Sequence, residues 1–126
     1  MIAHGVDLVH CPRVARLYEE HGERFLRRIY TERERQYCLE AVDPAPRLAA
    51  RFAAKEAVMK VLGTGLRGGV EWTDIETVPD PLGKPLVMLH GVSARLAATL
   101  GIARVVVSLS HCGEYALASA LGLGEA

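Results

Sequence analysis

The sequence predicts an α+β fold in which an antiparallel sheet packs against helices. Apolar residues recur at helical spacing mainly in the first half of the 126-residue chain. Short apolar segments separated by turn residues dominate the second half. Two pairs of these segments are joined by short turn-rich connections, which is typical of hairpins and hence of an antiparallel sheet.

The chain begins with a predicted strand and a helical stretch. Residues 2–9 are mostly apolar and suit a strand, although Asp7 places an acid in its middle. Pro12 suits the first turn of a helix, where its missing N–H has no partner to lose. Residues 13–29 are helical in character, with Gly22 as the candidate break point.

Two further helices are indicated by their ends. Thr31 and Glu34 have the spacing of a capping box, which predicts a helix beginning at Glu32. A loop rich in proline follows. The best-defined helix spans 47–62, has an apolar stripe, and ends at Gly63 as its C-cap.

The second half predicts two hairpins and one short helix. Strands are expected over 69–78 and 85–90, with a turn-rich connection between them. A short helix is expected over 93–100. The last two strands, over 105–110 and 115–121, flank a second tight turn.

The composition narrows the classes of function. Fifteen basic and fifteen acidic side chains leave a net charge of zero, and only 6% of residues are aromatic. General nucleic-acid and membrane-surface binders carry net positive charge, so both classes are disfavoured. No apolar run approaches the roughly 20 residues of a membrane span, and no signal peptide is recognisable. Three widely spaced cysteines form no disulfide framework and favour a reducing cytoplasm. We expect a single cytoplasmic domain over residues 1–126.

Asp7 allows two interpretations. It lies on the wet face of an edge strand, or it is a ligand for a hard cation such as Mg²⁺. A zinc site is disfavoured, because the two His-Cys dipeptides of the chain lack the spacing of zinc ligands.

The helix over 47–62 carries a second candidate group. Glu56 and Lys60 are one turn apart, which is either an ordinary surface pair or a site for Mg²⁺ and phosphate oxygens. Ala49 and Ala53 favour a close approach on the same side of the helix. Lys55 falls inside the apolar stripe, where a lysine needs a partner or must reach solvent. One carboxylate and two lysines on this helix would together suit Mg²⁺ and phosphate oxygens.

Two loop segments are weaker signals. Gly63, Thr64 and Gly65 either allow backbone amides to approach a phosphate or form a helix cap and a flexible loop. Ser110 and His111 are neighbours at a strand end and point to opposite faces, so they cannot act directly as nucleophile and base. His111 is then a surface residue, a phosphate contact or a base.

Arginines are concentrated in the first helical stretch. They form either a solvated face or a docking surface for an acidic protein, because guanidinium groups pair well with carboxylates. If the stretch were one helix, five of them would share about a third of its circumference: Arg13, Arg16, Arg24, Arg27 and Arg28.

Together these segments resemble the holo-[acyl-carrier-protein] synthases, a small trimeric class of 4′-phosphopantetheinyl transferase. The resemblance covers residues 2–121. It is carried by these motifs: Gly5-Val6-Asp7-Leu8-Val9 with Arg13, Arg28-Ile29-Tyr30-Thr31 with Glu34, Arg51-Phe52-Ala53-Ala54-Lys55-Glu56-Ala57 with Lys60, Leu62-Gly63-Thr64-Gly65, Trp72-Thr73-Asp74-Ile75-Glu76, Gly83-Lys84-Pro85 and Ser108-Leu109-Ser110-His111. Two positions depart from the pattern, His10 and Cys112.

The resemblance implies a reaction and a site. Such enzymes transfer the phosphopantetheine arm of coenzyme A to a serine of an apo acyl carrier protein, supporting fatty acid biosynthesis. Asp7 and Glu56 would hold Mg²⁺, and Lys60 would stabilise charge at the pyrophosphate. Active sites would form at the interfaces of a homotrimer, and the arginines would meet the acidic carrier. The residues implied to contact coenzyme A are Arg51, Lys60, Gly63, Thr64, Gly65, Ser110 and His111.

Several alternatives stay open from sequence. The serine proton could pass to a metal-bound water, to Glu56 or to His111. The carrier could belong to a polyketide or peptide synthetase. A non-catalytic module that holds a nucleotide related to coenzyme A is the rival from another class, and an RNA-binding domain is disfavoured by the charge.

Overall fold

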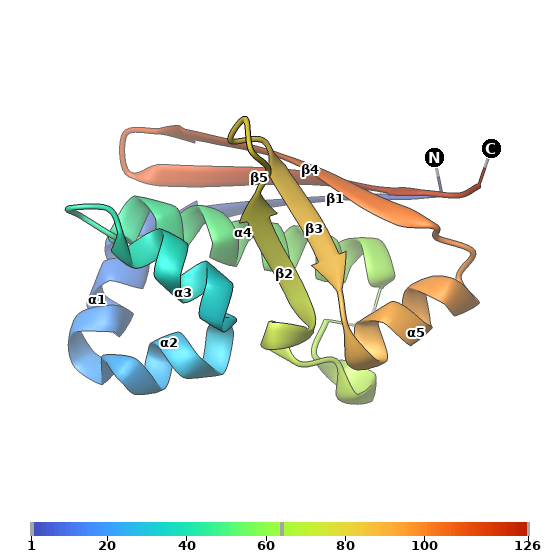
Figure 1. Ribbon diagram of the computed structural model, residues 1–126, viewed down its shortest axis with the longest axis horizontal. Helices are drawn as coiled ribbons and strands as arrows, with labels where there is room; N and C mark the ends of the chain where they lie inside the picture. Colours follow the sequence, from blue (N-terminus) through green and yellow to red (C-terminus); the bar gives the residue numbers. More distant parts are fainter. Residues whose placement is uncertain (1, 64, 126) are drawn as a thin grey trace.

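A three-stranded antiparallel sheet with one long helix across its inner face forms the centre of the molecule (Figure 1). The computed structural model describes residues 2–63 and 65–125. The sheet has the order β1 (Ala3–His10), β5 (Tyr115–Leu123), β4 (Arg104–Cys112), and the helix is α4 (Ala45–Leu62). The predicted α+β class is confirmed.

Strand register decides which side chains face α4. Ala116, Ala118 and Ala120 of β5 are fully buried, because α4 packs directly on that face of the sheet. Val6 and Leu8 of β1 point to the opposite face and are exposed. No described element covers that outer face, which forms the upper surface in Figure 1.

Three helices join β1 to α4. They are α1 (Cys11–His21), α2 (Glu23–Ile29) and α3 (Glu32–Leu39). Gly22 separates the first two with a φ of 53°, a conformation that favours glycine, so the predicted break is confirmed. Thr31 and Glu34 form the predicted capping box at the start of α3.

The remaining chain forms a hairpin and a short helix. Strands β2 (Ile75–Pro79) and β3 (Pro85–Leu89) pair antiparallel, and α5 (Gly91–Thr99) follows. The strand predicted over 69–78 is wrong in its first part, because residues 67–69 and 72–74 form 3₁₀ turns. Positive φ angles at Gly68 and Gly69 are incompatible with strand backbone.

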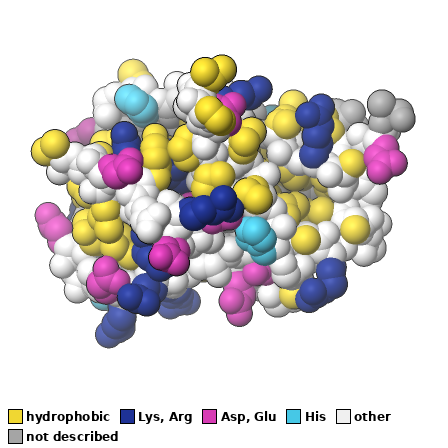
Figure 2. All heavy atoms as spheres, in the orientation of Figure 1, with side chains coloured by type: hydrophobic (Ala, Val, Ile, Leu, Met, Phe, Trp, Pro, Cys, Tyr) yellow, Lys and Arg dark blue, Asp and Glu magenta, His cyan; other side chains and the backbone are white. Residues whose placement is uncertain are grey.

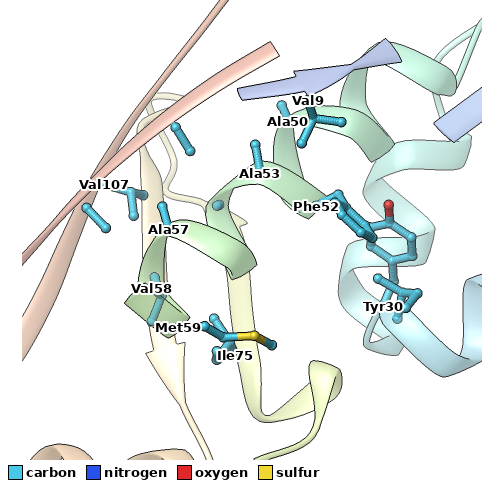
Figure 3. Close-up of a cluster of buried hydrophobic side chains, with 14 of the residues drawn as sticks. Val9, Tyr30, Ala50, Phe52, Ala53, Ala57, Val58, Met59, Ile75 and Val107 are labelled. Carbon is cyan, nitrogen blue, oxygen red and sulfur yellow. The ribbon is translucent and has the colours of Figure 1, made fainter. Parts of the chain in front are cut away.

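The core lies between α4 and its neighbours. Figure 3 shows Phe52, Ala53 and Val58 of α4 pointing in different directions, toward α2, the sheet and the hairpin respectively. Tyr30 is fully buried, and its hydroxyl donates to the Leu48 carbonyl at 2.8 Å. Almost all faces of α4 are buried. In its second half only Glu56 and Lys60 reach solvent, which makes them candidates for a functional role. No described helix is long and apolar enough to cross a membrane.

Candidate active site

The carboxylates of Asp7 and Glu56 come together because β1 lies directly on α4. Gly5 makes this close approach possible, since a Cβ at that position would lie only 2.2 Å from the Ala57 carbonyl oxygen. Asp7 is on the inner face of β1, with Ala118 as its partner on β5. The interpretation of Asp7 as a residue on the wet outer face is therefore wrong. It faces the helix that carries Glu56.

Asp7 is bound on one side only. The Lys60 ammonium donates to the Asp7 Oδ1 atom at 3.2 Å and to the Val6 carbonyl at 2.8 Å. Oδ2 of Asp7 is buried and has no hydrogen-bond partner. The Asp7 side chain is 12% exposed, whereas that of Lys60 is 55% exposed. A buried carboxylate oxygen without a donor is costly, so this atom is suited to an incoming cation.

The electrostatics of Glu56 point the same way. Burial raises the pKa of Glu56, and the charge of the nearby Asp7 carboxylate raises it further, while Arg13 and Lys60 act in the opposite direction. Two carboxylates that face each other in a partly dry site favour a shared proton or a metal ion.

These two side chains fit Mg²⁺. It takes hard oxygen ligands, often only one or two carboxylates, and keeps several waters. Among the described residues there is no cluster of three or more His, Cys, Asp or Glu side chains suited to a metal. Within the described residues, a cation at the orphaned oxygen of Asp7 would therefore have Asp7 and Glu56 as its carboxylate ligands.

A cleft of about 550 Å³ opens beside Glu56 and Lys60. Gly63 ends α4 in the left-handed conformation, with a φ of 81°, which confirms the predicted C-cap. The other residues lining the cleft are Met59, Gly65, Leu66 and Trp72. Thr64, which the sequence placed here, lies outside the described residues.

The aromatic wall of the cleft was not predicted as part of the site. The Trp72 ring stacks on Phe52 with centroids 5.0 Å apart. Trp72 is the only tryptophan in the chain. It begins the family motif Trp72-Thr73-Asp74-Ile75-Glu76, and this was the signal that could have identified it.

Three other predicted contacts lie elsewhere in this chain. Arg51 is on a different face of α4, buried, with its guanidinium 4.3 Å from the Tyr37 ring centroid and its Nε atom without a partner. Ser110 is exposed at the end of β4. His111 lines a separate cleft of about 430 Å³ with Cys11 and Glu114. A single chain therefore does not bring these three residues to Asp7 and Glu56.

The arginines are divided by the break at Gly22, so they do not share one helix face. Arg13 lies 6.0 Å from the Phe52 ring centroid, and Arg16 is exposed on α1. Arg27 pairs with Glu23 on its own helix. Arg24 and Arg28 line a cleft of about 400 Å³ that also contains His21, Phe25, Leu66 and Trp72. This cleft adjoins the one at Glu56, because both include Leu66 and Trp72.

Lys55 does not take part in either cleft. The sequence grouped it with Glu56 and Lys60 as a candidate for phosphate binding, and the structure corrects this. Its side chain is completely buried and its ammonium contacts Glu34 at 2.7 Å. Burial lowers the pKa of Lys55, and the charge of Glu34 opposes this shift.

Comparison with known proteins decides the family. A model of the 4′-phosphopantetheinyl transferase superfamily matches residues 3–120. A holo-[acyl-carrier-protein] synthase of Koribacter versatilis is 48% identical over 93% of this chain and 94% of its own length. One from Chlamydia pneumoniae is 46% identical over 94% of both. The chain belongs to the holo-[acyl-carrier-protein] synthase family of 4′-phosphopantetheinyl transferases.

Solved structures agree with this membership. The synthase of Neisseria meningitidis superposes with a TM-score of 0.87 at 36% identity and covers 98% of both chains. The Helicobacter pylori synthase, described in complex with coenzyme A, has a TM-score of 0.84 at 26% identity and covers 95% of this chain and 99% of its own. The predicted fold family and enzyme class are confirmed.

Proposed function

We propose that this synthase transfers the 4′-phosphopantetheine group of coenzyme A to a serine of an apo acyl carrier protein, with Mg²⁺ held by Asp7 and Glu56. The reaction leaves holo-carrier protein and adenosine 3′,5′-bisphosphate. The observation that carries the proposal is the unpartnered buried oxygen of Asp7, which faces the Glu56 carboxylate where Glu56 lines a cleft. The proposed carrier is that of fatty acid biosynthesis, since the relatives are named for the acyl carrier protein.

The pyrophosphate of coenzyme A would meet Lys60 and the bound cation. Bound Mg²⁺ polarises phosphate oxygens and offsets their charge. The Lys60 ammonium is already held beside the Asp7 carboxylate, and more than half of its side chain is open to solvent. It can donate to a phosphate oxygen without leaving Asp7, and so stabilise charge that develops as the bond to phosphorus breaks.

The nucleotide would enter the cleft along the end of α4. Gly63 and Gly65 lack side chains, which lets a phosphate or a ribose approach the backbone closely. Leu66 and Trp72 supply the apolar part of the same cleft. The volume of about 550 Å³ lies in the range usual for small-molecule sites.

We propose that Arg51, Ser110 and His111 reach the nucleotide from a neighbouring copy in a homotrimer. Within one chain these residues lie away from the cleft, and Arg51 carries a buried Nε atom without a partner. Proteins rarely leave contiguous apolar surface open to water, so exposed apolar patches mark contacts. On the outer face of β1 and β5, together with Ile2 just before β1, the large exposed hydrophobic residues are Ile2, Val6, Leu8, Tyr115 and Leu117. Figure 2 shows further hydrophobic side chains at the surface over the β2–β3 hairpin, where Leu82 and Leu86 are exposed.

The carrier would dock on α1 and α2. Arg24 and Arg28 rim a cleft whose floor is apolar, and this cleft shares Leu66 and Trp72 with the nucleotide cleft. An acidic helical partner seated there would bring its serine toward Glu56 and Lys60. Arg13 and Arg16 on α1, and Arg27 on α2, are further proposed contacts of the carrier.

Intact-protein mass spectrometry tests the proposal. Apo acyl carrier protein is incubated with the synthase, coenzyme A and Mg²⁺, with EDTA in a parallel sample. We expect a mass gain of one phosphopantetheine arm that EDTA prevents. No gain with several carriers, despite binding of coenzyme A, would support a non-catalytic nucleotide-binding module instead. A gain that EDTA leaves unchanged would remove the metal from the proposal.

A further inference from the structure

A fully buried ion pair connects the helix of the active site to the wall of its cleft. The Lys55 and Glu34 side chains have no solvent exposure, and Lys55 directly precedes Glu56 in α4. Lys55 points away from the cleft, so its ammonium cannot meet a phosphate there. The reaction has no direct use for this charge.

The Lys55 ammonium has three N–H donors, and the structure gives each one an acceptor. One is the Glu34 Oε1 atom, and the other two are the backbone carbonyls of Trp72, at 3.0 Å, and of Ile75. These carbonyls stand at the two ends of the 3₁₀ turn through which the glycine-containing segment after α4 joins β2. Lys55 therefore holds the backbone at the point where the cleft wall begins.

Glu34 completes the network from α3. Its Oε2 atom accepts from the Thr77 N–H at 2.8 Å, and Oε1 accepts from the Thr31 N–H at 2.9 Å as part of the capping box. One buried carboxylate thus ties α3, α4 and β2 together. A buried network in which every member has a partner holds its elements in one arrangement.

The far end of the 3₁₀ turn has its own anchors, since the Asp74 carbonyl accepts from the His90 N–H at 2.8 Å and from the Ser93 hydroxyl at 3.1 Å. At the Trp72 end, the Lys55 ammonium is the side-chain donor to the backbone. Gly68 and Gly69, which precede the wall, adopt positive φ angles. As glycines they have no side chain that could pack against the core. The Trp72 ring rests on Phe52 and lines both the nucleotide cleft and the basic cleft. The Lys55 contacts to the backbone beneath this ring therefore help to set its position relative to Glu56.

We infer that Lys55 and Glu34 are positioning residues that set the Trp72 wall against Glu56 and Lys60, and that they act on the affinity for coenzyme A rather than on the transfer step. This inference rests on the proposed function, because it takes coenzyme A as the occupant of the cleft. Its structural half, the placement of Trp72, does not depend on the ligand.

The test uses the double variant Lys55→Met/Glu34→Gln, which removes both charges together and so leaves no unpaired buried ion. Ile102→Ala is the matched control, because it opens a cavity in the core between α5 and β4, away from both clefts. As Trp72 is the only tryptophan, its fluorescence and its quenching by acrylamide report on the wall alone.

In the double variant we expect Trp72 to be quenched more readily, in the absence of any ligand. The KM and Kd for coenzyme A should rise about tenfold, the size expected from losing hydrogen bonds to a charged group, while kcat stays within about twofold. Ile102→Ala should melt at a lower temperature with unchanged quenching and an unchanged KM.

Two results would overturn the inference. Quenching and KM indistinguishable from those of Ile102→Ala would mean that the pair is only structural. A fall in kcat with KM unchanged would mean that Lys55 acts on the chemistry. If the wild-type protein bound no coenzyme A, the proposed function would fail, and quenching would still decide the placement of Trp72. Should the double variant not fold, Lys55→Gln alone answers the question by the same readouts, because the Glu34 carboxyl can take up a proton and so leaves no unpaired buried charge.

Discussion

Replacing Gly5 by alanine is expected to force β1 away from α4 and so to separate the two candidate metal ligands. The new Cβ would lie 2.2 Å from the Ala57 carbonyl oxygen and 2.9 Å from the Lys60 Cβ, whereas ordinary contact begins at 3.4 Å. The backbone carbonyl of a buried helix cannot turn aside. The strand and the helix must therefore move apart by about 1.2 Å.

The stability cost follows from this displacement. Alanine in a strand would by itself stabilise by up to about 1 kcal/mol relative to glycine. Overpacking of a rigid site costs about 1–3 kcal/mol, and here the upper end applies because the obstacle is backbone. The net loss is about 2 kcal/mol, which lowers the Tm of a domain of this size by roughly 8 °C.

We expect Gly5→Ala to lower the transfer rate strongly even at temperatures where the variant is folded. Displacing a catalytic group by about 1 Å can cost roughly a hundredfold in rate. Thermal unfolding followed by circular dichroism measures the first effect. Transfer to apo acyl carrier protein, followed by mass spectrometry below the Tm of the variant, measures the second.

Gly124→Ala is the matched control. A Cβ at Gly124 would meet the Cδ1 atom of Ile2 at 3.0 Å, and this atom is the far end of a flexible side chain that can move aside. We expect a Tm within about 2 °C of wild type and full activity for this variant. If Gly5→Ala behaves like Gly124→Ala in both assays, the close approach of β1 and α4 does not hold the site together.

Three other perturbations have defined outcomes. Glu56→Gln should lower the transfer rate by about three orders of magnitude. Without metal this variant should be no less stable than wild type, because one of two facing carboxylates loses its charge. Near-normal transfer by the variant in the presence of Mg²⁺ would contradict the assignment of Glu56 as a metal ligand. The double variant Arg24→Glu/Arg28→Glu should raise the KM for the carrier about tenfold or more and leave the KM for coenzyme A unchanged. Steady-state kinetics with each substrate measures both values, and an equal rise in the two KM values would contradict a docking role. Burial opposes ionisation of Glu76, yet hydrogen bonds from Arg33, Thr31 and His90 lower its pKa to about 2. A lowered folded-state pKa means that this carboxylate adds stability above pH 4.5 and loses it as the pH falls toward 2; Glu76→Gln should flatten urea-unfolding stability across that window, and an unchanged pH profile would refute the assignment.

The two lysines of α4 show where sequence reasoning succeeds and where it stops. The helical period correctly placed Lys55 in the apolar stripe and Lys60 on the face of Glu56. It could not name the partner of Lys55, because Glu34 already had a sufficient local explanation as a capping residue. Only the packing of α3 on α4 and β2 shows that one Glu34 carboxylate serves both purposes.

Asp7 shows the same limit. Its sequence neighbours indicate a strand, and alternation says only that it faces away from Val6 and Leu8. Which face is buried depends on α4, which is distant in sequence. The apolar side chains of Val6 and Leu8 are on the exposed face of β1, and Asp7 is on the face that packs against the helix.

Sequence alone determined most local features of this protein: the helices, most of the strand segments, the break at Gly22, the caps at Thr31 and Gly63, and the motifs that indicate the family. The first part of the strand predicted over 69–78 is the exception. Each correctly predicted feature depends on residues within one or two turns of each other, whose preferences act without the rest of the chain. Tertiary structure decided that Asp7 meets Glu56, that Lys55 is buried in an ion pair, and that Trp72 forms the cleft wall. These contacts join segments far apart in the chain. They result from many weak packing interactions acting together, which no local pattern records.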